Sequence, residues 1–505
     1  MTDTYKGKLT LKKNLWKRIF SEPDEKPVTK SKNEIKNDYI FWRKSIILTS
    51  YVAYVVAYLG RKNFSIAMPA MNEQIGISST DKGIILAIAS IIYGIGKFLN
   101  GSLADRSNVR AGLPINLILA CAFSSSLAFA PWVCKNWLSD HNSIMIYMCV
   151  FWGISNWFQS ALFPYCAKSL IRWFPNSTRA TNWARWSTAH EVGSFLALNS
   201  SAYVANAFGK FGFEAMFMVP FAISLVVGTI GFFSLRDRPE SLGLPDVEEI
   251  CGTKLASLTA KEKKEKDEEA KFTYFQILKK YILKNKVMWN LAFIYFCVYV
   301  FRTGPVDWMF EILTGDAGKA TKAKSLEGLQ NIDQSAAFQT SILCIVGALG
   351  TYFAPLISEK LFKGRRAPAN FWCLFIGAFS VIGMWLGSSH YSPIYSNSLL
   401  RNLVIYSSLG IAGFTVCVPQ VLVGGICAVE SSSKRVASAA SGFAGLLGYF
   451  GAAFGSTVNG ALTEISKAKY NDARLVLIYW GAITLLGAML CLPLWNVKAN
   501  KEYSH

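Results

Sequence analysis

Two arginines, Arg61 and Arg302, lie within long apolar stretches of the sequence, YVVAYLGRKNF and FCVYVFRTGPVDW. A charged side chain deep in a bilayer costs from about 3 to more than 10 kcal/mol, so it usually faces a bundle interior or an aqueous cavity. The two arginines lie almost half the chain apart, as matching positions in two halves would. Two guanidinium groups that face one cavity would bind an anion, and their bidentate geometry favours phosphate. The alternative is that both lie near helix ends and extend to the lipid interface.

Aromatic residues accompany both arginines at helical spacing. Tyr54, Tyr58 and Arg61 are spaced i, i+4 and i+7, so they share one face of a helix. Tyr299 and Arg302 are i, i+3 neighbours. These tyrosines could serve packing or an interfacial belt, but their position one turn from each arginine favours the cavity.

Other polar residues fall within apolar stretches. Lys62 and Asp307 are predicted to form a structural or gating pair between the halves, in preference to direct ligand contact. Trp186 and His190 are i, i+4 neighbours, and Lys97 lies in YGIGKFLNG. Taken alone, His190 is better explained as a hydrogen-bonded core histidine. The four histidines form no cluster, so no metal site is expected.

The elements that position these residues follow from composition. The 505 residues are 52% hydrophobic and 17% charged, whereas a soluble protein has about 25% charged residues. Apolar stretches of about 20 residues, enough to cross a bilayer as helices, recur along the chain. An all-α membrane protein with twelve spans is predicted, near 43–62, 83–103, 112–132, 143–166, 184–207, 213–235, 287–311, 336–357, 369–388, 399–427, 437–461 and 474–496.

A polar, Lys- and Glu-rich segment divides these spans into six and six. Two such halves are typical of alternating-access carriers, which bind substrate near the midplane between them. The predicted organisation is a basic arm (1–42), a six-helix bundle (43–235), a cytoplasmic linker (236–286), a second six-helix bundle (287–496) and a tail (497–505). The linker is interpreted as a solvated connection, with a dedicated partner site as the less favoured alternative.

The net charge of +20 is concentrated in the N-terminal arm and in alternate connections. This distribution predicts cytoplasmic termini and contact with lipid headgroups, and argues against nucleic-acid binding. The hydrophilic first forty residues predict no cleaved signal peptide. The eleven scattered cysteines are interpreted as buried free thiols. No phosphate-binding loop or catalytic motif is present, so neither an enzyme nor a cofactor is expected.

The turn after the second span, GSLADRSNVRAGLP, is echoed by PLISEKLFKGRRAP after the eighth. Ordinary positive-inside turns could explain both. The spacing of Gly101, Asp105, Arg106 and Arg110 is more specific, because it resembles the loop signature of the major facilitator superfamily. That resemblance implies close helix packing at the small residues. It also implies that the acid and the bases pair across a cytoplasmic gate.

Longer strings resemble the organophosphate:phosphate antiporters of that superfamily, which carry glycerol 3-phosphate or hexose 6-phosphate. They are RKNFSIAMPAM (61–71), GKFLNGSLADRSNVRAGLPINLILA (96–120), WFQSALFPYCAKSLIRWF (157–174), WARWSTAHEVG (183–193), LRDRPESLGLP (235–245) and ASGFAGLLGYFGA (440–452). The resemblance runs through nearly all the spans. It implies that Arg61 and Arg302 bind the phosphoryl group and that His190 also binds substrate. It places family cavity aromatics at Tyr54, Tyr58, Trp186, Tyr299 and Tyr449, and the interhelical pair at Lys62 and Asp307.

The chain departs from the family pattern at several positions. Phe163 and Tyr165 replace residues of the family's W-P-P-C in helix four, and Val418 replaces the glycine before the proline of helix ten. Cys344 stands in place of a helix-eight glutamate that partners the helix-two lysine. Lys97 would therefore lack its counter-charge and could face substrate. The connection 314–335 is also long.

The resemblance implies exchange of a sugar phosphate, most simply a hexose 6-phosphate such as glucose 6-phosphate, for inorganic phosphate. A glycerol-3-phosphate:phosphate antiporter is an alternative. A membrane sensor of external hexose phosphate that signals to a partner kinase is another, and an anion channel fits the two-half organisation less well. The expected protein is a monomer in a bacterial inner membrane, with the small phosphate esters and lipid as its partners.

Overall fold

The computed structural model describes residue 21 and residues 23–138, 140–250, 283–315, 332–427 and 437–496. Regular secondary structure in this part of the chain is entirely helical. Half of the predicted arm, the middle of the predicted linker, most of the connection 314–335 and the tail lie outside the described residues. All the residues predicted for the site lie inside them.

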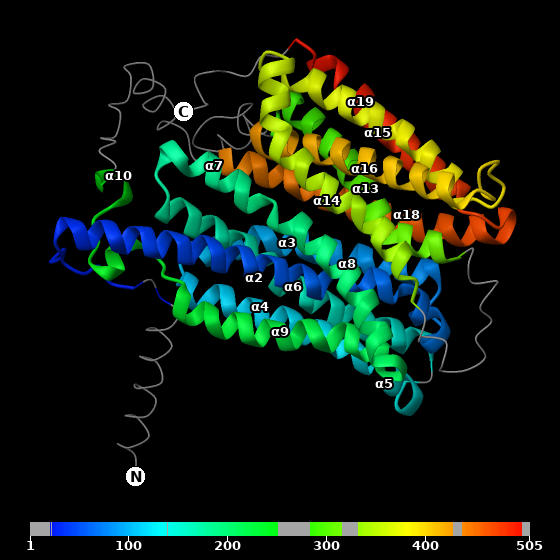
Figure 1. Cartoon of the computed structure of the whole chain (residues 1–505), viewed down its shortest axis with the longest axis horizontal. Helices are drawn as coiled ribbons and strands as arrows, with labels where there is room; N and C mark the ends of the chain where they lie inside the picture. The colour runs from blue at the N-terminus through cyan, green and yellow to red at the C-terminus, as the bar shows by residue number, and fades with distance from the viewer. Residues whose placement is uncertain are drawn as a thin grey trace.

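The first six predicted spans lie on helices that form an N-terminal bundle, the lower group in Figure 1. The third span continues through two short helices, and the fifth divides at Thr188. The bounds are α2 (Lys32–Ile75), α3 (Ser79–Asp105), α4 (Val109–Ser125), η1 (Ser126–Phe129), α5 (Ala130–Asn136), α6 (His141–Trp173), α7 (Asn176–Ser187), α8 (Ala189–Phe208), η2 (Gly209–Phe211) and α9 (Gly212–Ser234).

The other six predicted spans lie on helices that form a C-terminal bundle, the upper group in Figure 1. Their bounds are α13 (Lys286–Gly315), α14 (Gln334–Leu356), α15 (Arg366–Ser388), α16 (Ser398–Val421), α18 (Ala437–Tyr470) and α19 (Arg474–Met489). Short elements extend or connect the long helices: η3 (Pro239–Leu242), α10 (Val247–Ile250), the π-helical η7 (Ile357–Leu361) and η8 (Leu422–Cys427), and η10 (Leu492–Leu494).

Length and apolar composition support membrane crossing. Among the described residues, nine helical stretches are long and apolar enough, and one of them, Ser177–Ser234, contains both the fifth and sixth predicted spans. The two remaining predicted spans lie on α6 and α18, which are long but richer in polar and small residues. The twelve predicted spans therefore all fall on long helices.

Local sequence explains where several helices begin and end. Ser31 and Ser78 each form a capping box at a helix start, with Glu34 and Asp81 respectively. Gly76 ends α2 with a positive φ of 65°, a conformation that glycine adopts without steric cost. Asp140 caps α6, and hydrogen bonds from Ser143 lower the pKa of its carboxyl. The caps at Gly76 and Ser78 define a short turn between α2 and α3, which run in opposite directions.

The two ends of the bundles are named here by α2. The terminal face is the end where α2 begins, and the distal face is the end where it ends.

The N-terminal bundle contacts the C-terminal bundle mainly through α3 with α18 and α8 with α14. Near the distal face, a Cβ atom on Gly83 would lie 2.6 Å from the Ser456 carbonyl oxygen, and one on Gly460 would lie 2.5 Å from the Ser79 carbonyl oxygen. Two glycines thus allow α3 and α18 to pack closely.

Candidate functional site

A cavity lies between the two bundles, and the non-atom space within it, open solvent included, is about 650 Å³. Arg61 of α2 and Arg302 of α13 both line it. The structure therefore brings the two arginines to one cavity, although they are far apart in sequence. The other lining residues are Tyr58, Lys62, Ser65, Leu86, Ala89, Ser90, Trp152, Asn156, Tyr299, Thr303, Asp307, Tyr449, Ala452 and Ser456.

Arg61 contacts aromatic rings but no acid. Its guanidinium carbon lies 4.2 Å from the centre of the Tyr93 ring and 5.8 Å from that of Tyr58. Within the part of the chain that the structure describes, no carboxylate lies within ion-pair distance of Arg61. Cation–π contacts leave most of the guanidinium N–H donors available, so this side chain can bind an anion.

Arg302 has an acidic neighbour. Its Nη2 atom donates to Oε1 of Glu191 over 3.4 Å. The guanidinium carbon also lies 5.9 Å from the centre of the Tyr299 ring. Glu191 is buried, does not line the cavity and belongs to α8 of the opposite bundle. The contact therefore links the two bundles behind the cavity surface.

A row of tyrosines, of which Tyr299 and Tyr449 line the cavity, connects the two arginines. The Tyr93 and Tyr449 ring centres lie 4.8 Å apart, and those of Tyr449 and Tyr299 lie 5.2 Å apart. Since Tyr93 contacts Arg61 and Tyr299 contacts Arg302, the row extends from one guanidinium to the other. Phenolic hydroxyl groups supply neutral hydrogen-bond donors and acceptors beside the two cations.

The lysine and aspartate predicted to pair do lie in contact. Lys62 Nζ is 2.5 Å from Asp307 Oδ1, and the Ser65 hydroxyl donates to the same oxygen over 3.1 Å. Asp307 is only 7% exposed, so its charge is separated from bulk water. The pair joins α2 to α13 on the distal side of the two arginines.

Three other predicted residues lie beside the cavity without lining it. The Tyr54 ring packs 4.8 Å from Trp186, and Trp186 packs 6.0 Å from Phe163, measured between ring centres. Lys97 Nζ lies 4.4 Å from the centre of the Phe163 ring and 5.8 Å from that of Tyr449. No acid pairs with Lys97 among the described residues. These side chains extend an aromatic wall from the cavity toward the terminal face.

His190 also lies outside the cavity lining. Its Nε2 atom is 2.9 Å from Glu191 Oε1, but the angles do not make this a hydrogen bond. Its Nδ1 atom contacts the Ser187 carbonyl oxygen, and its ring centre is 6.1 Å from that of Tyr58. His190 is therefore placed between Glu191 and Tyr58, and direct contact with a ligand stays a prediction.

The predicted gating residues of the turn after α3 lie at the terminal face. Asp105, Arg106 and Arg110 are exposed and form no ion pairs with one another or with other described residues. The Arg110 Nε atom donates to the Phe232 carbonyl oxygen over 2.6 Å. A Cβ atom on Gly101 would meet nothing within 4 Å. The close packing that the loop signature implies at Gly101 is absent in this state.

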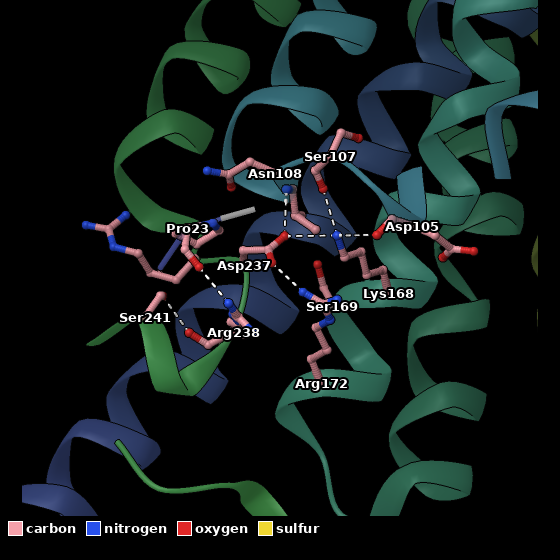
Figure 2. Close-up of polar contacts among 12 residues, drawn as sticks. Pro23, Asp105, Ser107, Asn108, Lys168, Ser169, Arg172, Asp237, Arg238 and Ser241 are labelled. Atoms are coloured by element: carbon pink, nitrogen blue, oxygen red, sulfur yellow. Dashed lines mark hydrogen bonds and ion pairs between the residues drawn. The ribbon is translucent and has the colours of Figure 1, made fainter. Parts of the chain in front are cut away.

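Other residues hold this turn in place (Figure 2). Lys168 donates to the carbonyl oxygens of Asp105 and Ser107 over 3.3 and 2.7 Å, and its Nζ is 3.3 Å from Asp237 Oδ1. Arg172 pairs with the other Asp237 oxygen. The buried Asp237 therefore connects α6, the turn after α3 and the segment after α9. All of these elements belong to the N-terminal bundle.

The structure shows what the residues that depart from the family pattern contact. The Tyr165 hydroxyl lies 2.7 Å from the Ser107 hydroxyl, so this residue supports the same turn. Cys344 and Val418 are buried in the C-terminal bundle. Phe163 packs against Lys97. Aromatic contact thus replaces the missing counter-charge at Lys97.

Sequence reasoning missed two residues of the site, Glu191 and Tyr93. Glu191 follows His190 directly and is an ionisable residue in a predicted span, a signal that the rule applied to the arginines would have recognised. Tyr93 lies four residues before Lys97, one helical turn away. No group of three or more potential metal ligands occurs among the described residues, and the ten described cysteines are free.

Comparison with known proteins gives consistent results. Residues 50–456 match the Major Facilitator Superfamily. The chain is 31% identical to the probable hexose phosphate transport protein of Chlamydia trachomatis, over 97% of this chain and all of the relative. It is 32% identical to the membrane sensor protein UhpC of Escherichia coli, over 96% and 99%. The inward-open structure of the xylose transporter XylE from E. coli superposes with a TM-score of 0.62 at 15% identity, over 91% and 97%, which supports the fold.

Proposed function

The chain belongs to the organophosphate:phosphate antiporter family of the major facilitator superfamily, and from this premise we propose that it exchanges a hexose phosphate for inorganic phosphate. The relative from C. trachomatis is named as a probable hexose phosphate transport protein, which favours a hexose phosphate over glycerol 3-phosphate. The membrane is a bacterial inner membrane. The protein works as a monomer with the terminal face in the cytoplasm.

The observation that carries the proposal is that Arg61 and Arg302, one from each bundle, line a single cavity. A phosphoryl group bridges the two guanidinium groups, because bidentate charge-assisted hydrogen bonds suit its oxygens. Tyr58, Tyr299 and Tyr449 surround it with hydroxyl groups. Tyr54, Trp186, His190 and Lys97 extend this site toward the terminal face, where the rest of the ester lies.

Polar contacts between the bundles indicate which side is closed. These contacts join residues of α2 and α3 to residues of α13 and α18, and they lie between the cavity and the distal face. Ser79 and Lys82 of α3 both contact Glu311 of α13, and Thr80 contacts Glu464 of α18. The described residues form no ion pair between the bundles on the terminal side of the cavity. This arrangement is that of a carrier closed to the outside.

In the proposed cycle the two bundles, residues 43–235 and 287–496, move as lobes about the bound anion. Two guanidinium groups that face one cavity repel each other, and this repulsion opposes closure around an empty site. A bound phosphate attracts both and lets the lobes close. The distal contacts then open while the turn containing Asp105, Arg106 and Arg110 closes the terminal side. Occupancy thereby controls reorientation.

Counterflow tests this function. Purified protein in liposomes that contain inorganic phosphate should take up labelled glucose 6-phosphate, faster than glycerol 3-phosphate and at least tenfold faster than protein-free liposomes. Unlabelled internal phosphate should be required. Absence of counterflow with every ester of a hexose and triose phosphate panel would contradict the proposal.

A sensor is the second candidate, because a relative of equal similarity is named as a membrane sensor protein. A sensor would bind hexose phosphate and transmit the signal to a partner without moving it. Titration calorimetry on the same preparation separates the two functions. Tight binding of glucose 6-phosphate without counterflow would favour the sensor, whereas binding with counterflow would favour the carrier.

A further inference from the structure

Glu191 is a buried acid that the proposed binding of phosphate by two arginines does not use. It is 2% exposed and reaches from α8 to the C-terminal bundle. Its Oε1 atom accepts hydrogen bonds from Arg302 Nη2 and from the Cys417 thiol, each over 3.4 Å. A carboxylate at this depth is stable only beside a positive charge. Arg302 supplies a permanent positive charge, and His190 Nε2 lies 2.9 Å from the same oxygen.

The C-terminal bundle provides space for this carboxylate. A Cβ atom on Gly347 of α14 would lie 2.9 Å from Cys417 Sγ and 3.7 Å from Glu191 Cδ. The absence of a side chain at Gly347 thus leaves room for the Cys417 thiol, which donates to Glu191. Arg302 faces the cavity and Glu191 does not. The carboxylate therefore accepts a hydrogen bond from Nη2 of Arg302 and leaves the other N–H donors of the guanidinium free to face the cavity.

The contact is weak enough to coexist with a substrate. At 3.4 Å the hydrogen bond from Arg302 is longer than the usual 2.7–3.2 Å for N–H···O bonds. A phosphate that accepts two N–H groups at shorter distance would bind Arg302 more strongly than this single contact does. Glu191 consequently does not prevent binding of a phosphate.

Glu191 changes the charge balance of the empty cavity. Four lining residues are charged: Arg61, Lys62, Arg302 and Asp307. Lys62 is neutralised by Asp307 and Arg302 by Glu191. Arg61 is the one lining cation without an acidic partner among the described residues. The empty cavity therefore carries one unneutralised positive charge instead of two, and the repulsion that opposes closure is reduced.

We propose that Glu191 is a resident counter-anion of Arg302 that allows the empty carrier to reorient, giving this protein a second activity: one-way transport of phosphate or phosphate ester down its gradient. The inference rests on the proposed exchange function, since it concerns the same cavity. Exchange uses a loaded carrier in both directions. One-way transport requires the empty carrier to return, and Glu191 takes the role that the phosphate charge has in the loaded carrier.

The experiment compares two rates in proteoliposomes loaded with labelled inorganic phosphate. Net efflux is measured into a medium without phosphate, and exchange into a medium with unlabelled phosphate. Equal potassium on both sides with valinomycin prevents a membrane potential from stopping net anion movement. In the unmodified protein, net efflux should reach at least a tenth of the exchange rate. In Glu191→Gln the ratio of net efflux to exchange should fall at least tenfold, and Glu191→Asp, which keeps the charge, should restore most of it.

A second variant makes the test independent of the folding of Glu191→Gln. Gly347→Ala keeps the carboxylate but displaces the Cys417 thiol that donates to it, so it should lower the same ratio. An unmodified protein that exchanges phosphate without net efflux would overturn the inference. An unchanged ratio of net efflux to exchange in both Glu191→Gln and Gly347→Ala would also overturn the inference. Loss of exchange in the unmodified protein would instead overturn the proposed function, so the two failures are distinguishable.

Discussion

At the scale of single residues, the cavity is defined by how buried charges are neutralised. Arg61 is stabilised by aromatic rings, Arg302 by Glu191, and Lys62 by Asp307. An unpaired buried charge is strongly unfavourable, while a buried pair contributes little net stability. Removing one member of a pair should therefore cost far more than removing both.

The pair formed by Lys62 and Asp307 gives a prediction for stability. Asp307→Asn leaves the Lys62 ammonium without its acid and should lower the free energy of unfolding by about 3–5 kcal/mol. The double variant Lys62→Gln, Asp307→Asn should recover more than half of that loss. Thermal unfolding of the purified variants in detergent measures both.

The exposed pair of Lys30 and Asp38 provides the matched control. Asp38→Asn should change stability by about 1 kcal/mol or less, because solvent screens an exposed pair. A double variant as unstable as Asp307→Asn would contradict the account, since the loss would then not come from an uncompensated lysine.

The role of the two arginines could be predicted because a charged residue within an apolar stretch can be recognised from the sequence alone. It could not assign Glu191 a partner, because that depends on the approach of α8 to α13. Tyr93 has its place in the row of tyrosines only because α3 packs against α18. Contacts between the halves are long-range, and spacing along one helix does not encode them.

At the scale of elements, α3 of one bundle and α18 of the other pack closely near the distal face. Their backbones approach where Gly83 meets Ser456 and Gly460. The sequence predicted both helices, but not that these glycines face each other. A larger side chain at Gly83 cannot be accommodated without separating the two helices.

Gly83→Val should therefore favour opening of the distal side. In cells, a cysteine introduced at Ser456 should react at least fivefold faster with a membrane-impermeant maleimide when Gly83→Val is also present. The reason is that Ser456 lines the cavity and is covered from the distal face by this helix contact. Labelling of the protein without the Ser456 cysteine gives the background from native thiols.

Gly101→Val is the control on the same helix, because a Cβ atom there meets nothing within 4 Å. It should leave the labelling rate unchanged. Equal labelling with and without Gly83→Val, in protein that remains folded by its melting temperature, would show that the helix contact does not close the distal side.

At the scale of the whole molecule, composition and apolar length were sufficient to predict twelve helices and two groups of six. They were sufficient because a helix that crosses lipid must satisfy its own backbone and be about 20 residues long. The terminal turn shows the limit of this reasoning. Asp105, Arg106 and Arg110 match a gating signature, but they form no ion pairs among described residues in a structure whose bundles are joined by polar contacts near the opposite face. Which state a carrier adopts is a property of the packing between the bundles.

The central claim is that one anion binds both Arg61 and Arg302, each contributed by a different bundle. Its most direct test is uptake of labelled glucose 6-phosphate into phosphate-loaded proteoliposomes by Arg61→Lys and Arg302→Lys, with Arg401→Lys, at the distal end of α16, as the control. Lysine keeps the charge but loses the bidentate geometry. Each of the first two variants should fall to the level of protein-free liposomes while keeping its melting temperature, and the control should retain full uptake. Near-normal exchange by either cavity variant would contradict the account.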